Sequence, residues 1–300
     1  MGALSSTIGT PVIFDRILAR HHRARAAKEL EKYNFLERRA VHDLSERIQA
    51  TNRHFTTALQ WGGTLCSLDA TPATLKIKHL IHADSAEALL KDRPLAFTGD
   101  EEHLPIGDNG FDLIVSVLSL HKVNDVPGTL IQINRALRPD GLFLAALLGG
   151  NTLDELRHSL TAAEAEITGG ASPRISPFAD VRDMGSLLQR TGFSLPVVDV
   201  DHLTAHYDTM TSLMKDLRGM GEANSLTSRR RVPTRRTVLT RADDIYRDYF
   251  GLPDGRLPAQ FDILYLTGWS PHESQPRPLK PGSARLSLTQ VLPDNTPSDR

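Results

Sequence analysis

Short and nearly continuous apolar runs recur between residues 56 and 149, and polar stretches separate them. Runs that are apolar throughout, rather than alternating, are typical of strands buried on both faces of a parallel sheet. The pattern therefore predicts strands at TALQW (57–61), IKHLIHAD (77–84), FDLIVSVLSL (111–120) and GLFLAALLGG (141–150).

The stretch between the last two runs has helical periodicity. Leu130, Ile133 and Leu137 fall on one helical face, and Asp125 or Asn124 is placed to cap the first turn. A strand, a helix and a strand in this order form a βαβ unit. With its neighbours, this unit predicts an α/β fold with a doubly wound, mostly parallel sheet.

Beyond residue 150 the pattern changes to mixed helices and strands. A helix is predicted over 151–167, with Asn151 or Thr152 as its cap, and a second helix is predicted to end at Gly192. The other predicted elements are strands at 195–207 and 261–269, which add to the sheet edge, and helices within 208–250.

The N-terminus begins basic, but acidic residues soon join the helix formers, unlike an organelle-import sequence. We expect a structural helical segment after a short lead. The chain is accordingly divided into an N-terminal lead and helical segment (1–50), an α/β domain (51–283) with a helical substrate-side region (151–250), and a flexible tail (284–300).

The composition is that of a globular protein, with 40% hydrophobic and 24% charged residues in a chain of 300. A single cysteine, Cys66, excludes an intramolecular disulfide. No apolar stretch is long enough to predict a transmembrane segment.

The charge of the chain limits its binding partners. A net charge of -1 argues against nucleic-acid binding. Five arginines in 229–236 form either a solvated face or a site for an anionic partner.

Polar stretches follow the predicted strands, where ligands bind in open α/β sheets. Gly62 and Gly63 follow the first strand, and Asp84 ends the second. An acid about 20 residues after the first glycine is placed to accept hydrogen bonds from ribose hydroxyls. Two more polar stretches, 98–105 and 116–125, follow the third and fourth strands. These features predict a nucleotide-like cofactor at this edge.

Three motifs, in this order, resemble those of the class I S-adenosylmethionine-dependent methyltransferases: GDEEHLP (99–105), FDLIVSVLSLH (111–121) and LRPDGLFL (137–144). Further stretches are similar to one subfamily, the methyltransferase-like assembly factor of respiratory complex I and its alphaproteobacterial relatives. These are IFDR (13–16), GGNTLDELRHSL (149–160), SPRISPFADVRDMGSLLQRTGF (172–193), MKDLRGMGEAN (214–224) and GWSPHESQPRP (268–278).

The resemblance implies a methyltransferase-like, Rossmann-like domain with S-adenosyl-L-methionine as cofactor. The mitochondrial member of the subfamily is regarded as hydroxylating an arginine of the iron-sulfur subunit next to the quinone site of complex I. The implied partner is therefore a protein substrate, the iron-sulfur subunit. The implied reaction is methyl transfer or arginine hydroxylation, and the implied location is the bacterial cytoplasm, with the periphery of the inner membrane as an alternative.

The family's cofactor loop has the pattern acid–x–Gly–x–Gly–x–Gly. On this chain Gln60 stands at the acid position, Gly62 at the first glycine, and Thr64 and Cys66 at the other two. Losing the acid's charge-assisted hydrogen bond costs about 1.5–3 kcal/mol, and a β-branched threonine is ill suited to positive φ. The sequence therefore predicts either impaired S-adenosylmethionine binding or normal binding by a rearranged loop.

The resemblance assigns the other cofactor contacts downstream. Asp84 and Asp100 would hold the ribose and the adenine, Glu101 would position the adenosine side, and Ser119 and His121 would line the pocket wall. No catalytic residue is assigned. Three functions stay open: a modifying enzyme of complex I, a non-catalytic assembly chaperone with a degraded loop, and a carrier-protein or small-molecule methyltransferase.

Other chemistry-bearing residues have ordinary interpretations. His82, His103 and His121 lack the spacing of a facial iron site, so we expect no metal. Glu102 is expected to be solvated. Glu273, in HESQ after the last strand, either belongs to a strand-end cap or pairs with an arginine of a protein substrate.

Overall fold

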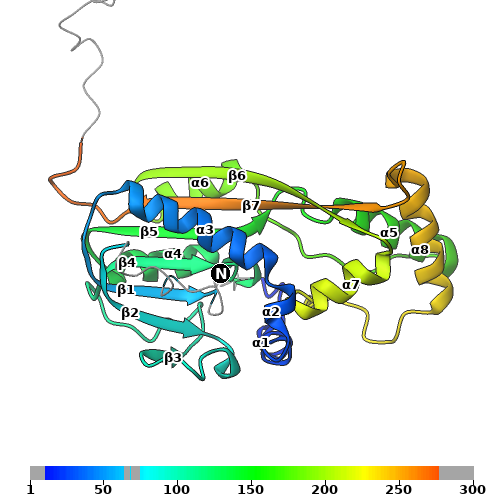
Figure 1. Cartoon of the computed structure of the whole chain (residues 1–300), viewed down its shortest axis with the longest axis horizontal. Coiled ribbons are helices and arrows are strands. Elements are labelled where there is room, and N and C mark those ends of the chain that lie inside the picture. The colour runs from blue at the N-terminus through cyan, green and yellow to red at the C-terminus, as the bar shows by residue number, and fades with distance from the viewer. Residues whose placement is uncertain (1–10, 64–67, 69–74, 277–300) are drawn as a thin grey trace, which may run out of the picture.

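The computed structural model describes residues 11–63, 68 and 75–276. Within these ranges seven strands form one sheet in the order β3-β2-β1-β4-β5-β7-β6 (Figure 1). The first five in this order run parallel, whereas β7 runs antiparallel to both of its neighbours. The strands are β1 (Phe55–Gly62), β2 (Ile77–Asp84), β3 (Ala96–Thr98), β4 (Phe111–Val117), β5 (Leu137–Gly149), β6 (Ser194–Tyr207) and β7 (Leu257–Trp269).

Helices cover both faces of this sheet, which confirms the predicted doubly wound α/β fold. On one face α4 (Val126–Ala136) and α6 (Val181–Arg190) pack on Ile114 and Phe143. The opposite face carries α3 (Phe35–Ala50), α5 (Asp154–Thr168), α7 (Met210–Gly219) and α8 (Arg236–Phe250).

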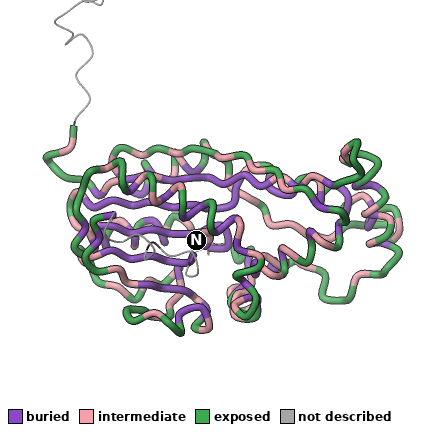
Figure 2. The backbone as a smooth tube through the Cα atoms, in the orientation of Figure 1, coloured by how far each residue is buried: buried purple, intermediate pink, exposed green. Residues whose placement is uncertain are grey.

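Burial explains why the central strands read as apolar runs. In β1, Ala58 belongs to the core on the α3 side and the next residue, Leu59, belongs to the core on the α4 side. Both side chains are buried, as both faces of the strand are covered. Figure 2 shows the central strands as the buried interior of the molecule. By contrast β6, at the sheet edge, alternates between partly and fully exposed positions over most of its length.

Local signals predicted some helix ends correctly and others wrongly. Asp125 caps α4 by accepting from the Gly128 N–H at 2.9 Å, and Gly192, with φ 86°, follows the end of α6 as predicted. The prediction that Leu137 lies in the helix was wrong, because β5 begins there. The predicted cap of α5 was also wrong. Leu153, at φ 59°, precedes that helix instead.

The N-terminal helices lie at the carboxyl ends of the parallel strands (Figure 1). They are α1 (Arg16–Ala26) and α2 (Leu30–Tyr33), followed by α3. The Asn124 side chain accepts from the N–H groups of Ile13 and Phe14, at 2.8 and 2.7 Å. The Asp15 N–H donates to the Ser225 carbonyl at 2.8 Å. These bonds fix the start of α1 over the predicted cofactor edge.

Candidate cofactor and substrate site

The loop after β1 depends on two glycines and on Gln60. Gly62 and Gly63 have φ values of 72° and 60°, where other residues are strained, and a Cβ on either would overlap Val117. The buried Gln60 amide donates to the carbonyls of Gly62 and Gly63, at 3.0 and 2.8 Å. Its oxygen accepts from the Leu68 N–H at 3.0 Å. Gln60 therefore organises the loop, and its predicted cofactor contact stays a prediction.

A carboxylate could not replace this amide, because an ionised carboxylate only accepts hydrogen bonds. The glutamine that stands at the position of the family's acid is therefore the side chain that this loop conformation requires. The other two altered loop positions, Thr64 and Cys66, lie outside the described residues.

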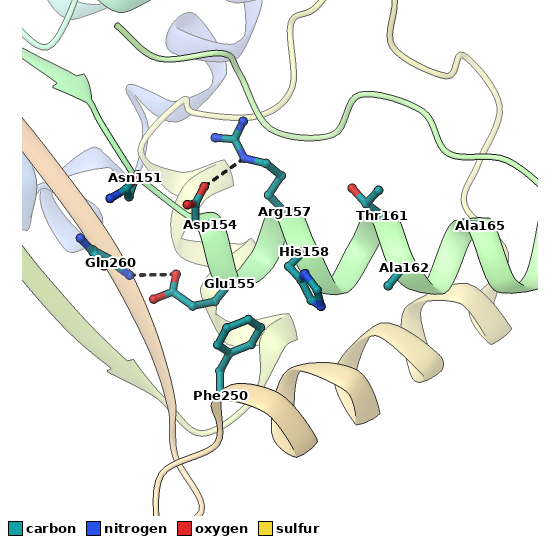
Figure 3. Close-up of a pocket in the computed structure, with 10 residues that line it drawn as sticks. All are labelled: Asn151, Asp154, Glu155, Arg157, His158, Thr161, Ala162, Ala165, Phe250 and Gln260. Atoms are coloured by element: carbon teal, nitrogen blue, oxygen red, sulfur yellow. Dashed lines mark hydrogen bonds and ion pairs between the residues drawn. The ribbon is translucent and has the colours of Figure 1, made fainter. Parts of the chain in front are cut away.

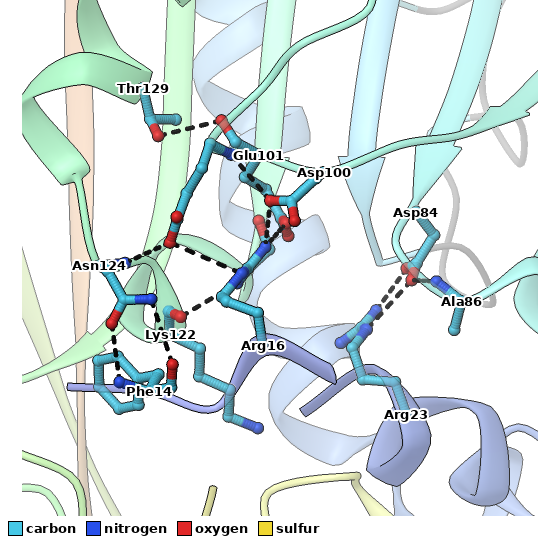
Figure 4. Close-up of polar contacts among 12 residues, drawn as sticks. Phe14, Arg16, Arg23, Asp84, Ala86, Asp100, Glu101, Lys122, Asn124 and Thr129 are labelled. Carbon is cyan, nitrogen blue, oxygen red and sulfur yellow. Dashed lines mark hydrogen bonds and ion pairs between the residues drawn. The ribbon is translucent and has the colours of Figure 1, made fainter. Parts of the chain in front are cut away.

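Asp84, at the end of β2, is held by an arginine from α1 (Figure 4). Arg23 donates Nε–H to Oδ1 at 3.2 Å and Nη2–H to Oδ2 at 2.5 Å. The Asp84 side chain is 1% exposed, and the Ala86 N–H also donates to its Oδ1 at 2.9 Å. Burial alone would lower the pKa of Arg23, but Asp84 raises it above its usual value. The predicted ribose-binding carboxylate thus lies in a buried bidentate ion pair.

A second arginine of α1 holds the next carboxylates along the sheet edge (Figure 4). Arg16 donates to Asp100 Oδ1 at 2.9 Å, pairs with Glu101, and reaches the Lys122 carbonyl at 3.0 Å. Burial would raise the pKa of Asp100, but the Glu102 N–H and Arg16 lower it. The predicted adenosine-side acids are therefore brought together, with Arg16 as their counterion.

Glu102 is not solvated, so that expectation was wrong. Its carboxylate accepts from the Asn124 N–H at 2.6 Å, and its Oε1 lies 3.7 Å from Arg16 Nε. The side chain is 18% exposed. Glu102 is therefore a partly buried acid with a structural role, because it joins the segment after β3 to the loop after β4.

His121 and Lys122 converge on a partly buried carboxylate, that of Glu222, which sequence reasoning did not select. Lys122 Nζ lies 2.8 Å from Glu222 Oε2 and donates to the Gly221 carbonyl at 2.9 Å. His121 Nε2 lies 3.2 Å from the same Glu222 oxygen. Burial alone would raise the pKa of Glu222, but Lys122 and His121 lower it below its usual value. Ser119 hydrogen-bonds Ser116 at 3.1 Å and lies at the adjoining turn.

Two patterns could have signalled the missed residues. Arg16 and Arg23 are two helical turns apart, so a helix places both on one face. Their carboxylate partners lie 61 to 85 residues away in sequence, so no local pattern shows which acids these arginines pair with. Glu222 lies in the MKDLRGMGEAN stretch, but its role depends on α7 folding back over the sheet edge.

The HESQ stretch lies away from this site. Because β7 is antiparallel to β5, Trp269 pairs with Leu142 near the start of β5, at the opposite edge of the sheet from Asp84. Glu273 therefore does not lie at the cofactor edge, and its pairing with an arginine of a protein substrate stays a prediction. Arg53 stacks over the Trp269 ring at 4.7 Å, which supports the strand-end interpretation.

Hollows of different sizes lie along the helical region and beside the strand ends. A groove of about 750 Å³ is lined by α5, the end of α8 and β7, and by no predicted cofactor residue (Figure 3). A cavity of about 380 Å³ lies between α5 and α7 and has Glu222 in its wall. Glu222 also lines a small hollow of about 20 Å³ with Arg23, Glu37 and Leu118. Glu222 therefore lies between the 380 Å³ cavity and the strand ends.

Two further features of the described residues bear on function. No group of three or more His, Cys, Asp or Glu side chains is arranged as a metal site among them. Within the same ranges, no helix has the length and apolar character needed to cross a membrane.

The comparisons with known proteins agree with this geometry. A family model described as a methyltransferase domain matches residues 50–145. The YcgJ protein of Bacillus subtilis has a solved structure with a TM-score of 0.51 and 14% identity, covering 77% of this chain and 99% of that one. At that identity the likeness shows the fold alone.

Curated relatives extend the match to nearly the whole chain. Arginine-hydroxylase NDUFAF5, mitochondrial, of Danio rerio is 39% identical over 93% of this chain and 89% of its own length. The Homo sapiens protein of that name is 42% identical over 93% and 83%. The malonyl-[acyl-carrier protein] O-methyltransferase of Laribacter hongkongensis is 32% identical over 72% and 70%. The chain therefore belongs to the class I methyltransferase superfamily and, within it, to the NDUFAF5 family.

Proposed function

We propose that this protein binds S-adenosyl-L-methionine at the carboxyl edge of the sheet and modifies an arginine of a complex I subunit, the iron-sulfur subunit beside the quinone site. The observation that carries the proposal is that Asp84, at the end of β2, and Asp100 and Glu101, just after β3, follow the two strands that come next in the sheet to β1, which ends at Gly62. The relatives' name, arginine-hydroxylase, supports the choice of side chain. The proposed location is the bacterial cytoplasm or the periphery of the inner membrane.

The residues fit this cofactor in part. Gly62 and Gly63 allow the left-handed turn after β1, and Asp84 ends β2 where a carboxylate can accept from ribose hydroxyls. Asp100 and Glu101 would hold the adenosine side. S-adenosylmethionine supplies an electrophilic methyl group when it binds such a site. Arg23 already donates to both oxygens of Asp84, so cofactor binding must compete with Arg23 or share the carboxylate with it.

Glu222 is the group best placed to receive the side chain of a protein substrate. Its carboxylate lines the 380 Å³ cavity, and Lys122 and His121 keep it ionised. An ionised carboxylate pairs well with a guanidinium, which has several donors in a planar fork. Glu222 would orient a bound arginine so that its guanidinium lies near the strand ends. Holding two reacting groups in position in this way supplies much of an enzyme's rate enhancement.

A non-catalytic assembly role is the second candidate, and the Arg23–Asp84 pair favours it. If this pair is permanent, the ribose carboxylate is unavailable and the fold acts only as a binding scaffold. Calorimetric titration with S-adenosylmethionine separates the two candidates. The enzyme proposal expects measurable binding that Asp84→Asn weakens by at least about tenfold. Lack of binding to the intact, folded chain supports the scaffold.

The reaction itself is tested in cells that lack their own family member. Complementation with this chain should restore complex I assembly, and mass spectrometry of the iron-sulfur subunit should show a modified arginine. A gain of one oxygen identifies hydroxylation, for which an oxidant from outside this chain must supply the oxygen, whereas a gain of a methyl group identifies methyl transfer from S-adenosylmethionine. Restored assembly with an unmodified subunit would contradict the enzymatic proposal.

A further inference from the structure

Four cations gather where the end of α1 meets the end of α7. Arg25 and Lys28 lie at or just after the last turn of α1, and Lys215 and Arg218 lie in the second half of α7. All four residues are exposed. Within the ranges that the structure describes, none of them has an ion-pair partner. We call these four residues the basic face.

Two neighbouring hollows open on the basic face. The cavity of about 380 Å³ has Arg25 and Arg218 in its wall, and a second hollow of about 430 Å³ is lined by all four cations. Glu29 also lines the second hollow, but it pairs with Lys32 at 3.1 Å. The first cavity is largely apolar apart from its charged residues, with Leu156, Leu160, Ile175, Met214, Leu217 and Leu239 in its wall.

The helices that carry the basic face are held in close contact. The end of α7 approaches α2 so tightly that a Cβ on Gly219 would overlap the Tyr33 ring. Gly221 lies against the backbone of Arg23, where a Cβ would come within 3.2 Å of its Cα. The spacing of the cations is therefore set by the fold. The net charge of the whole chain is only -1, so a cluster of four unpaired cations is a local feature.

We propose that the basic face docks an acidic segment of a partner protein, with a large apolar side chain of that segment packing against the leucines that line the 380 Å³ cavity. Several unpaired cations around two hollows complement a chain with several carboxylates. An apolar pocket beside them suits one anchor residue, as in many peptide-recognition sites. Because Glu222 lines the same cavity, the docked segment lies next to the strand ends. Docking of an acidic segment rests on the proposed function in one respect only, namely that the docked partner is the protein substrate.

The test uses the full chain and a fluorescein-labelled peptide of about twelve residues, rich in glutamate with a central pair of leucines. Fluorescence anisotropy should show binding that weakens strongly between about 50 and 200 mM salt. The double substitution Arg25→Glu and Arg218→Glu should weaken binding by about tenfold or more. Circular dichroism checks that the variant is folded.

A matched control places the same charge reversals on α6, where Arg182 and Arg190 are also exposed and unpaired in the described structure. Arg182→Glu with Arg190→Glu should change the peptide's Kd by less than about twofold. Equal losses in the two double variants would overturn the proposal. So would equally tight binding of a peptide with glutamine in place of glutamate.

A further arm separates a protein segment from a lipid surface. The chain is mixed with vesicles of anionic lipid, and the peptide is added as a competitor. Sedimentation with vesicles, together with no peptide binding, would overturn the proposal in favour of a membrane surface. Each titration is run with and without S-adenosylmethionine. The Kd of the peptide is then measured even where the cofactor does not bind, so failure of the proposed function and failure of this proposal are told apart.

Discussion

Gln60 shows how a single side chain can reshape a cofactor loop. Its amide satisfies two loop carbonyls and a backbone N–H inside a fully buried site. The sequence showed only that the family's acid was missing, and it could not show what the glutamine does instead. The apparent loss of a cofactor ligand is, in structural terms, the gain of two donated hydrogen bonds.

Restoring the acid should therefore destabilise the protein. Gln60→Glu buries a carboxylate against two carbonyl oxygens, and we expect the free energy of unfolding to fall by about 2–4 kcal/mol. Urea unfolding measures the change. The exposed Gln49→Glu is the matched control and should shift stability by less than about 0.5 kcal/mol. An unchanged midpoint for Gln60→Glu would mean that the loop does not need the amide.

The Arg23–Asp84 pair is expected to couple strongly. Because both groups are largely buried, Arg23→Met and Asp84→Asn should each cost about 3 kcal/mol by leaving an uncompensated partner. A double-mutant cycle by urea unfolding should give a coupling energy of about 2 kcal/mol. For the exposed Lys32–Glu29 pair the same cycle should give no measurable coupling, because solvent screens the two charges. Additive costs at Arg23 and Asp84 would contradict a direct ion pair.

What the sequence predicted well was local or periodic. Strand positions followed from apolar runs, and the Asp125 cap followed from a side chain that bonds only three residues ahead. What it missed was set by tertiary contacts. Arg16 pairs with carboxylates more than 80 positions away in sequence. Leu153 takes a left-handed conformation, which is usually signalled by a glycine at that position. The acids of the site could be selected from a motif, whereas their counterions could not.

At the scale of elements, the contact between α7 and α2 depends on Gly219. A methyl group there would overlap the Tyr33 ring, so Gly219→Ala should lower the free energy of unfolding by about 2 kcal/mol, despite alanine's better helix propensity. Thermal unfolding measures it. Gly170→Ala, which has open space around it, should change stability by less than about 0.5 kcal/mol. Equal effects at the two sites would contradict a close contact.

Glu164 joins α5 to Ser172 and Arg174, in the loop that follows it, and to the distant Arg230, and it makes these contacts depend on pH. Burial would raise its pKa, but Arg174, Ser172 and Arg230 lower it to about 2. A carboxyl group with a lowered folded-state pKa stabilises the protein above its unfolded-state pKa, and this stabilisation is lost as the pH falls through the folded-state value.

Acid titration of stability should reveal this link. Between about pH 5 and pH 2 the wild-type chain should lose about 2 kcal/mol more than Glu164→Gln, which has no charge to lose. Urea unfolding across that range gives the difference. Glu166→Gln, at an exposed position of the same helix, should follow the wild-type curve. A Glu164→Gln curve parallel to the wild type would show that the carboxylate is not what carries the acid sensitivity.

At the scale of the whole molecule, the N-terminal helices are part of the fold's core and of its site. α3 contributes Leu36, Leu44 and Ile48 to the core, and α1 provides the counterions of the strand-end acids. Although residues 1–50 were outlined as a separate segment, we expect that removing them abolishes cooperative thermal unfolding. Removal of residues 277–300 is the control and should leave the transition in place. A cooperative transition without residues 1–50 would instead show an independent domain.

The position of β7 in the sheet has a consequence for how the chain is made. β6 pairs with β7 and with no other strand of the described sheet, yet β7 begins 50 residues after β6 ends, counting from Tyr207 to Leu257. On the ribosome, β6 therefore emerges as an edge without a partner, and one side of β5 stays open until β7 follows. Unpaired edges of this kind invite aggregation, so β7, the last strand of the described sheet to be synthesised, covers the open edges of both β5 and β6.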